Sequence, residues 1–490
     1  MSINTLIKRL QNIMRGDDLS GTVQYLKQMI WMVFLKVYDA KEQEWEIDDD
    51  NYVSIIPENL KWRSWAEDNN DGNALTGDDL VKFVNNTLID TLKKLEINEL
   101  TPKKHIIVKN IFEDASNFMK DGTKLRQMIN ALNEIDFTNY TQAHEFGDMY
   151  ESMLKDLQES KRDGGEFYTP RALTDFIVEM VDPRLGESIA DFACGTGGFL
   201  VSALKHTENK VQTNEDLQIC RNSIYGIEKK SFAYALGLTN LILHDVDEPR
   251  MYYDNSLKYN VRNFSDDEKF DVILMNPPYG GTEDSIVQMN FPQDYRASET
   301  ADLFMALIMY RLRMNGRVGV VLPDGFLFGT EGAKRNLKEK LLKEFNLHTV
   351  LRLPKSVFAP YTSIATNVLF FDENTDGTNE TWFYRMDMPE GYKAFSKTKP
   401  IKSEHFNPIR EWWNSRTDIS DTEGNPKSKK FSRQEIIDGG YDLDVCGFPH
   451  KVEEILEPDV LINNYLERKA VLHEQMKVTL KQVLQLISEK

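Results

Sequence analysis

Cysteine is scarce in this sequence, and the few cysteines are scattered. The 490 residues contain Cys194, Cys220 and Cys446, with no CxxC spacing, and the eight histidines form no cluster with them. A disulfide framework needs paired cysteines, and a structural zinc site needs closely spaced Cys or His ligands. We therefore expect neither kind of site.

Long apolar runs are also absent. The longest, residues 29–35, is far shorter than the roughly 20 residues with which a helix spans a bilayer. Residues 1–10 lack the apolar segment and the cleavage site of a signal peptide. These features predict a cytoplasmic protein that does not bind membranes.

Positive charge is in short supply as well. The chain has 59 Lys and Arg against 78 Asp and Glu, a net charge of −19. Because nucleic acids and anionic membranes bind positive surfaces, we expect the chain to bind either one poorly on its own. The acidity is uneven, since residues 1–150 hold 17 basic and 25 acidic residues, whereas residues 281–371 hold 11 and 9.

The length predicts two or three domains, and the first, residues 1–150, is expected to be helical. Leu6, Leu10 and Ile13 repeat at helical spacing, and residues 25–38 read as an apolar, buried helix. Further helical patterns cover residues 79–94 and 106–131. No residue here carries obvious chemistry, which indicates a docking or partner-binding domain.

Short apolar strands alternate with helices in the next region, which we assign to a domain of residues 151–400. Strands are expected at 188–193, 224–227, 270–275, 318–322, 349–353 and 365–371. Helices are expected at 172–181, 198–205, 232–243, 302–314 and 332–345. This alternation predicts an α/β fold with a doubly wound sheet.

Residues 401–490 are predicted to form a polar connection and a C-terminal helix for subunit docking. The polar, turn-rich segment begins at residue 372, and helical periodicity returns near residue 451. One apolar stripe follows the last helix, formed by Tyr465, Leu472, Met476, Leu480, Val483 and Ile487. Such a stripe packs on its own domain or docks on another subunit, and the sequence leaves both open.

A glycine-rich loop follows the first expected strand of the α/β region. It reads Asp191-Phe192-Ala193-Cys194-Gly195-Thr196-Gly197-Gly198-Phe199 and leads into a helix. Glycines let a backbone turn sharply and approach a ligand closely at the carboxyl end of a strand. The spacing differs from the GxGxxG pattern of dinucleotide-binding sites, so the ligand need not contain a pyrophosphate. A tight structural turn is the alternative.

An acid ends the second expected strand, and a proline-rich turn ends the third. Glu228 stands where a βαβ unit places a partner for ribose hydroxyls, although a lone acid there can simply be solvated. The third strand ends in Asn276-Pro277-Pro278-Tyr279. The two prolines stiffen the turn, the Asn276 amide oxygen and the Pro277 carbonyl are acceptors, and Tyr279 can stack on a planar base. This set of groups suits a planar exocyclic amine.

Together these motifs resemble the amino-methylating DNA methyltransferases that use S-adenosylmethionine. Within that family the chain is most similar to the modification (M) subunit of type I restriction–modification systems. Residues 191–199 resemble its cofactor motif and Asn276–Tyr279 its catalytic NPPY/F motif. The family's FYTPR motif is matched by Glu166-Phe167-Tyr168-Thr169-Pro170-Arg171. The resemblance covers residues 145–371, with three motifs in the expected order.

The resemblance implies a Rossmann-like domain that methylates N6 of adenine in DNA, with the target base flipped out of the duplex. Asn276, Pro277, Pro278 and Tyr279 are then catalytic, and no metal is needed. The implied cofactor-binding residues are Glu166, Phe167, Tyr168, Thr169, Pro170, Arg171, Asp191, Gly195, Thr196, Gly197, Gly198 and Glu228. Two assignments stay open: Arg171 faces the cofactor carboxylate or pairs with a local acid such as Glu166, and either Asn255 or Asp254 lies near the cofactor's adenine.

The partners implied by the resemblance are double-stranded DNA, a specificity (S) subunit and a second M subunit, with a restriction (R) subunit as a further candidate. After residue 371 too little chain remains for a visible target-recognition domain, which agrees with sequence readout by a separate subunit.

Other functions also fit parts of the pattern. The NPPY motif suits methylation of cytosine N4, of an RNA base or of a protein glutamine amide. A non-catalytic scaffold subunit is a further alternative, although NPPY is complete here. A nicotinamide-dependent dehydrogenase is disfavoured, because GxGxxG is absent and NPPY has no use in hydride transfer.

Overall fold

The computed structural model describes residues 3–67, 74–139, 146–148, 150–155, 168–359, 361–374, 376–396, 398–448 and 458–488. The chain divides into two compact units, Met1–Gly447 and Phe448–Lys490, and each is described by itself. None of the helices in the described ranges is long and apolar enough to cross a membrane.

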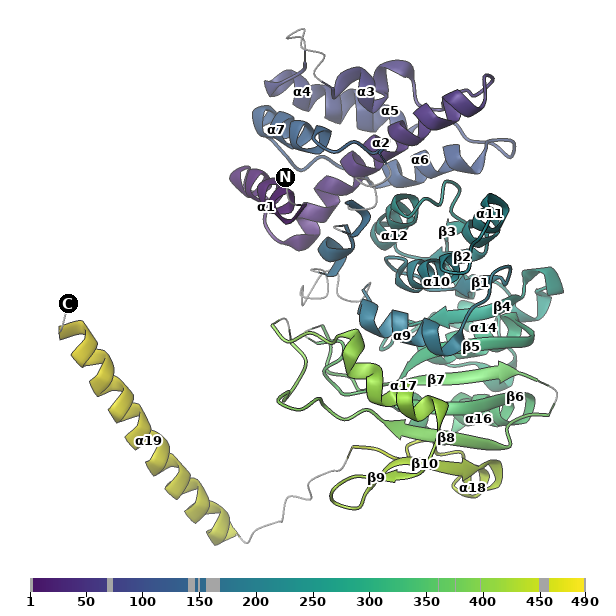
Figure 1. Ribbon diagram of the computed structural model, residues 1–490, viewed down its shortest axis with the longest axis vertical. Coiled ribbons are helices and arrows are strands. Elements are labelled where there is room, and N and C mark those ends of the chain that lie inside the picture. Colours follow the sequence, from purple (N-terminus) through teal and green to yellow (C-terminus); the bar gives the residue numbers. More distant parts are fainter. Residues whose placement is uncertain are drawn as a thin grey trace. The chain divides into compact units, whose positions relative to one another are not determined.

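Helices form the N-terminal part of the larger unit (Figure 1). They are α1 (Ile3–Gly16), α2 (Thr22–Asp48), α3 (Trp62–Trp65), α4 (Gly77–Phe83), α5 (Ile89–Lys93), α6 (Lys103–Glu113) and α7 (Gly122–Asn133). The apolar helix expected at 25–38 is confirmed, since α2 is buried from residue 28 to residue 40. The helical pattern at 106–131 is interrupted between α6 and α7, where the Asp121 side chain caps α7 by accepting hydrogen bonds from the backbone N–H groups of Thr123 and Lys124.

A ten-stranded sheet follows, in the order β3-β2-β1-β4-β5-β7-β6-β8-β10-β9. Its strands are β1 (Ile189–Asp191), β2 (Ile224–Glu228), β3 (Met251–Tyr253), β4 (Phe270–Met275), β5 (Leu312–Pro323), β6 (Phe345–Arg352), β7 (Thr366–Glu373), β8 (Glu380–Arg385), β9 (Ile419–Ser420) and β10 (Pro426–Ser432). The strands β3, β2, β1, β4 and β5 are parallel, so their carboxyl ends share one edge. β7 is antiparallel to both β5 and β6.

Helices cover both faces of the sheet, which confirms the expected doubly wound α/β fold. Val272 and Leu274 of β4 pack with α9 (Arg171–Val181) on one face. Ile273 and Met275 face the opposite side and pack with α14 (Thr300–Arg311) and α16 (Gly332–Glu344). Because neighbouring side chains of a strand point to opposite faces, a strand covered on both sides reads as one apolar run.

Three parts of the sheet differ from the sequence-based expectation. The strand β5 begins at Leu312, inside the helix expected at 302–314, and the other two differences concern β3 and residues 372–440. β3 was not predicted, because two of its three residues are exposed and give no apolar run. Residues 372–440, expected to be a polar connection, add β8, β9 and β10 and the helices α17 (Asn407–Asn414) and α18 (Arg433–Asp438). In β10 the lysines at 429 and 430 are exposed, so the strand has too few apolar residues to be recognised by composition.

Helix α12 (Ser231–Leu243) joins the N-terminal helices to the sheet. It packs beside β2 and β3 on one side and against α2 on the other (Figure 1). The Asn110 amide donates a hydrogen bond of 3.2 Å to the Tyr234 hydroxyl, and Lys41 forms an ion pair with Asp245. Two further helices, α10 (Gly198–Glu208) and α11 (Asn214–Asn222), connect β1 to β2.

The smaller unit contains one long helix, α19 (Pro458–Ser488). Its described side chains include seven exposed large apolar residues, namely Ile462, Tyr465, Leu466, Val471, Leu472, Met476 and Leu480. The stripe expected from the sequence is therefore exposed as far as residue 480, and the side chains of Val483 and Ile487 lie outside the described residues.

Candidate active site

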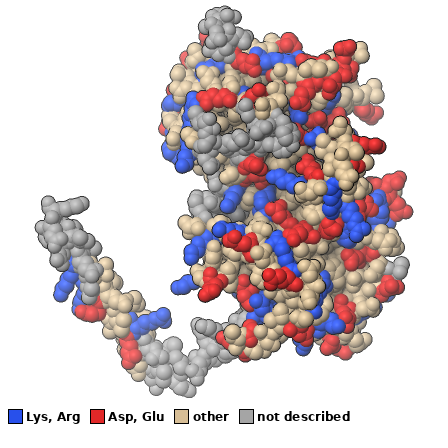
Figure 2. Space-filling view, in the orientation of Figure 1, with Lys and Arg blue, Asp and Glu red and all other residues tan. Residues whose placement is uncertain are grey.

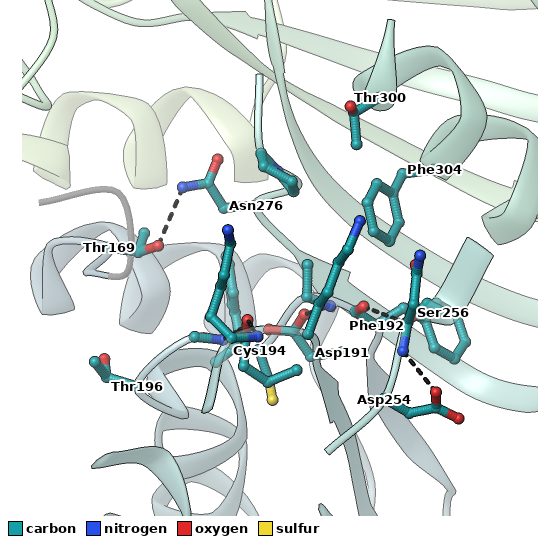
Figure 3. Close-up of a pocket in the computed structure, with 18 of the residues that line it drawn as sticks. Thr169, Asp191, Phe192, Cys194, Thr196, Asp254, Ser256, Asn276, Thr300 and Phe304 are labelled. Atoms are coloured by element: carbon teal, nitrogen blue, oxygen red, sulfur yellow. Dashed lines mark hydrogen bonds between the residues drawn. The ribbon is translucent and has the colours of Figure 1, made fainter. Parts of the chain in front are cut away.

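A pocket lies at the carboxyl ends of β1, β2 and β4 (Figure 3). It contains about 850 Å³ of space, its opening to solvent included. Its lining comes from the ends of β1 and β2, the segments that follow β1, β2, β3 and β4, the segment before α9 and the start of α14: Thr169, Asp191, Phe192, Ala193, Cys194, Gly195, Thr196, Gly198, Phe199, Glu228, Lys229, Lys230, Asp254, Asn255, Ser256, Asn276, Pro278, Glu283, Thr300 and Phe304.

The glycine-rich loop forms the wall between β1 and α10. Gly195 and Gly197 have φ values of 53° and 77°, a left-handed conformation that glycine adopts without strain. The loop also passes close to α12, since a Cβ atom on Gly237 would lie 2.7 Å from the Gly195 carbonyl oxygen. The sharp turn expected from the sequence agrees with this geometry, whereas the close approach to a ligand stays a prediction.

Two acids hold this loop in place. The buried Asp191 carboxylate accepts a hydrogen bond from the backbone N–H of Ala193, and burial raises its pKa well above the usual range. Glu228 accepts hydrogen bonds from the backbone N–H groups of Gly195, at 2.9 Å, and of Lys230, at 2.7 Å. Glu228 therefore connects the loops that follow β1 and β2 at the floor of the pocket.

Asp254 and Asn255 both line the pocket after β3. The Asp254 carboxylate pairs with Lys258 and accepts a hydrogen bond of 2.7 Å from the Tyr259 hydroxyl. The Asn255 side-chain oxygen accepts from the backbone N–H of Leu257. Both side chains are thus fixed at the pocket wall.

The Asn276 amide is oriented by the segment before α9. Its Nδ2 donates a hydrogen bond of 3.2 Å to the Thr169 hydroxyl, drawn as a dashed line in Figure 3. Its Oδ1 is buried and has no hydrogen-bond partner among the described residues. Buried acceptors are almost always paired in folded proteins, which makes this oxygen a candidate acceptor for a ligand.

The rest of the proline-rich turn faces different surroundings. Pro278 lines the pocket and is exposed, whereas Pro277 is buried and Tyr279 half-buried, and neither is part of the lining. The Tyr279 ring packs edge-on against Phe358, with ring centroids 6.2 Å apart, and burial raises its pKa. Tyr279 is therefore held beside the pocket that Asn276 lines.

The segment expected to hold the cofactor is described from Tyr168 onward, and Glu166 and Phe167 lie outside the described residues. Thr169 lines the pocket, and Pro170 precedes the first residue of α9. The Arg171 guanidinium lies 4.7 Å from the centre of the buried Tyr168 ring. Arg171 pairs with Glu151 and is not among the lining residues, so the local acid that it pairs with in the structure is Glu151.

Several lining residues were not anticipated from the sequence. Thr300 and Phe304 come from α14, which was expected only as a helix. Lys229 and Glu283 form an ion pair of 3.0 Å that connects the loop after β2 to the chain beyond Tyr279. Their positions depend on contacts between distant segments, for which the sequence carries no local signal.

The arrangement combines a ligand cradle with an acceptor for a planar amine. The pocket suits a ligand with a nucleoside part. Its lining combines the glycine backbone of the loop with the Glu228 carboxylate and the rings of Phe192 and Phe304. Asn276 lines the same pocket, and its Oδ1 is a buried acceptor with no partner among the described residues. Within the described residues, no group of three or more His, Cys, Asp or Glu side chains is placed to hold a metal ion.

Comparisons with known proteins agree with this geometry. A family model described as N-6 DNA Methylase matches residues 141–455, and one described as HsdM N-terminal domain matches residues 3–132. The chain is 46% identical to the type I restriction enzyme EcoEI methylase subunit of Escherichia coli, over 97% of this chain and 96% of that protein. It is 28% identical to the StySJI methylase subunit of Salmonella typhimurium, over 94% and 92% of the two chains. Among solved structures, the chain is similar to one from a study titled "Structural basis underlying complex assembly and conformational transition of the type I R-M system". The TM-score is 0.82 and the identity 36%, over 99% of this chain and 98% of that chain.

Proposed function

Because the chain belongs to the N-6 DNA methylase family, as the modification subunit of a type I restriction–modification system, we propose that its pocket binds S-adenosylmethionine beside a flipped adenine. The product is DNA methylated at N6 of adenine at specific sites. One observation carries the proposal that the reacting group is an amine. Asn276 lines the pocket, and its Oδ1 is a buried acceptor with no partner among the described residues.

The residues present fit this cofactor. Gly195, Thr196 and Gly198 of the glycine-rich loop line the pocket, whereas Gly197 is not among the lining residues, and we assign the methionine end of the cofactor to this loop and to Thr169. Glu228 is assigned to the ribose hydroxyls, and Asn255 and Asp254 to the adenine end. When bound, the cofactor supplies an electrophilic methyl group on sulfur.

The chain's own contribution to the reaction is alignment. Asn276 Oδ1 accepts one hydrogen of the adenine N6 amine and the Pro277 carbonyl accepts the other, so that the nitrogen lone pair points at the methyl group. Tyr279, supported by Phe358, stacks on the flipped base. Holding both reactants in this geometry replaces a bimolecular encounter by an intramolecular step.

Cofactor titration and methyl transfer test this function together. We expect the assembled complex to bind S-adenosylmethionine but not NAD in calorimetry, and to methylate adenine in DNA only when the specificity subunit is present. Labelled cofactor and nucleoside analysis of the product identify the methylated base. Binding of the cofactor without methylation in the complete complex would favour a scaffold, and methylcytosine would contradict the adenine assignment.

We also propose double-stranded DNA, a specificity subunit and a second modification subunit as partners. Figure 2 shows Lys and Arg interspersed with Asp and Glu over the face in view, with no continuous basic surface there. With a net charge of −19, the chain benefits from a partner that supplies positive surface for phosphate contacts. The exposed apolar stripe of α19 is the segment that we assign to docking on the specificity subunit.

Leu472→Glu is expected to abolish co-purification with the specificity subunit and leave cofactor binding unchanged. Leu472 is 54% exposed on the α19 stripe, and a charge there would have to be desolvated in an apolar interface. The matched control is Ala470→Glu, which adds the same charge to the opposite side of the same helix. Retention of the partner by Leu472→Glu in size-exclusion chromatography would refute the docking assignment.

A further inference from the structure

Glu151 lies where four segments of the larger unit meet. It belongs to the helical residues 150–155, ahead of the described part of the cofactor segment. Its carboxylate accepts hydrogen bonds from Arg171 Nε and Nη2 and from the Asn240 side chain of α12. Asn240 also donates to the Thr196 carbonyl of the glycine-rich loop, at 3.0 Å. One carboxylate thus joins α9, α12 and the loop to the helical residues 150–155.

Arg171 links Glu151 to two residues of the pocket lining, Thr169 and Thr196. Besides its two bonds to Glu151, it donates to the Thr169 carbonyl at 3.2 Å and to the Thr196 hydroxyl at 3.3 Å. Four of its five N–H groups therefore have partners within the protein. The guanidinium also fills the space beside Gly198, where a Cβ atom would lie 2.0 Å from Arg171 Nη1.

Arg171 and Glu151 form a largely buried ion pair in which the charged forms of both side chains are favoured. The side chains of Arg171 and Glu151 are 19% and 12% exposed. Burial alone would raise the pKa of Glu151, but the Arg171 charge and the hydrogen bonds from Arg171 and Asn240 bring it below the usual range. Removing one partner of such a pair leaves the other charge buried and uncompensated. Without Glu151, we therefore expect Arg171 to move and to lose its hydrogen bonds to Thr169 and Thr196.

We propose that Glu151 is a positioning residue for methyl transfer. It fixes the Arg171 guanidinium, and Arg171 in turn sets Thr196 in the glycine-rich loop and Thr169, whose hydroxyl orients the Asn276 amide. The proposal rests on the function proposed above for this pocket. It assigns Arg171 to the support of the cofactor loop, in place of a direct contact with the cofactor carboxylate.

Glu151→Gln in the assembled complex tests the proposal. The variant keeps the shape but loses the charge and one acceptor, so we expect kcat for methyl transfer to fall about 100-fold. The Kd of S-adenosylmethionine should rise, whereas the KM for DNA should stay near the wild-type value. Because Glu151 acts through Arg171, the double variant Glu151→Gln/Arg171→Gln should be no more impaired than the worse single variant.

Glu187→Gln is the matched control. Glu187 makes a similar two-bond pair with Arg317, with side chains 21% and 24% exposed, at the opposite edge of the sheet. The positioning role is wrong if Glu151→Gln and Glu187→Gln have the same kcat for methyl transfer per folded molecule. It is also wrong if the losses caused by Glu151→Gln and Arg171→Gln add in the double variant. If Glu151→Gln fails to fold, Glu151→Asp replaces it, and its kcat is compared with that of Glu187→Gln and with that of its double variant with Arg171→Gln. Failure of the wild-type complex to bind the cofactor would instead refute the function of the pocket.

Discussion

Asn276→Ala is expected to lower kcat for methyl transfer about 1,000-fold while the complex still binds S-adenosylmethionine. The substitution removes the buried Oδ1 acceptor from the pocket wall and the hydrogen bond from Nδ2 to Thr169. Without the acceptor, the N6 amine is no longer held with its lone pair toward the methyl group. Single-turnover kinetics with preformed complex and DNA measure the chemical step directly.

Two further variants separate the contributions of the Asn276 amide. Asn276→Asp keeps an acceptor oxygen and should retain more activity than Asn276→Ala. Thr169→Val removes only the hydroxyl that accepts from Nδ2, and a smaller loss is expected because Oδ1 remains. Wild-type turnover by Asn276→Ala would show that this amide does not bind the reacting amine.

Gly198→Ala is expected to reduce both cofactor affinity and stability. The new Cβ atom would lie 2.0 Å from Arg171 Nη1 and 3.0 Å from Arg171 Cζ, so the guanidinium must leave its bonds to Glu151, Thr169 and Thr196. Overpacking of this kind costs about 2 kcal/mol of unfolding free energy. If cofactor binding requires Arg171 in its original position, the bound state carries an additional cost of about 2 kcal/mol that the free protein avoids, and the affinity for S-adenosylmethionine falls about 30-fold.

Gly325→Ala is the control for replacing a glycine by alanine where no clash results. Gly325 lies in the short helix α15 (Asp324–Phe328), and a Cβ atom there meets nothing within 4 Å. Its replacement should stabilise the protein by about 0.5–1 kcal/mol, because alanine loses less entropy in a helix. Denaturant unfolding and cofactor titration of both variants give the two quantities. Equal behaviour of Gly198→Ala and Gly325→Ala would mean that Arg171 moves aside without consequence for the pocket.

Much of the pocket could be predicted from the sequence, because its key groups are local. The left-handed backbone at Gly195 and Gly197 favours glycine, and the two prolines at 277 and 278 stiffen the turn that follows a strand. Glu228 ends a strand beside the loop that it binds. The parallel strands β1, β2 and β4 then bring these groups to one edge, as expected for a doubly wound sheet.

The outer part of the sheet could not be predicted in the same way. Strands β8 and β10 are paired with each other, and in β10 the exposed lysines at 429 and 430 hide the pattern of a half-buried strand. A strand that is covered on one face needs apolar residues on that face only, so the composition of β10 resembles that of a polar connection.

The sequence by itself determined three local features to which we assign the chemistry: the glycine-rich loop, the acid that ends the second strand and Asn276 on its rigid turn. Only the tertiary structure decided which groups hold that chemistry in place. Arg171 could have faced the cofactor or an acid, and the fold brings it to Glu151, twenty residues earlier in the chain. Thr169 reaches Asn276 over 107 residues and Asn240 reaches Glu151 over 89. Backbone conformation depends on neighbouring residues, whereas the partner of a buried charge depends on how distant segments cross.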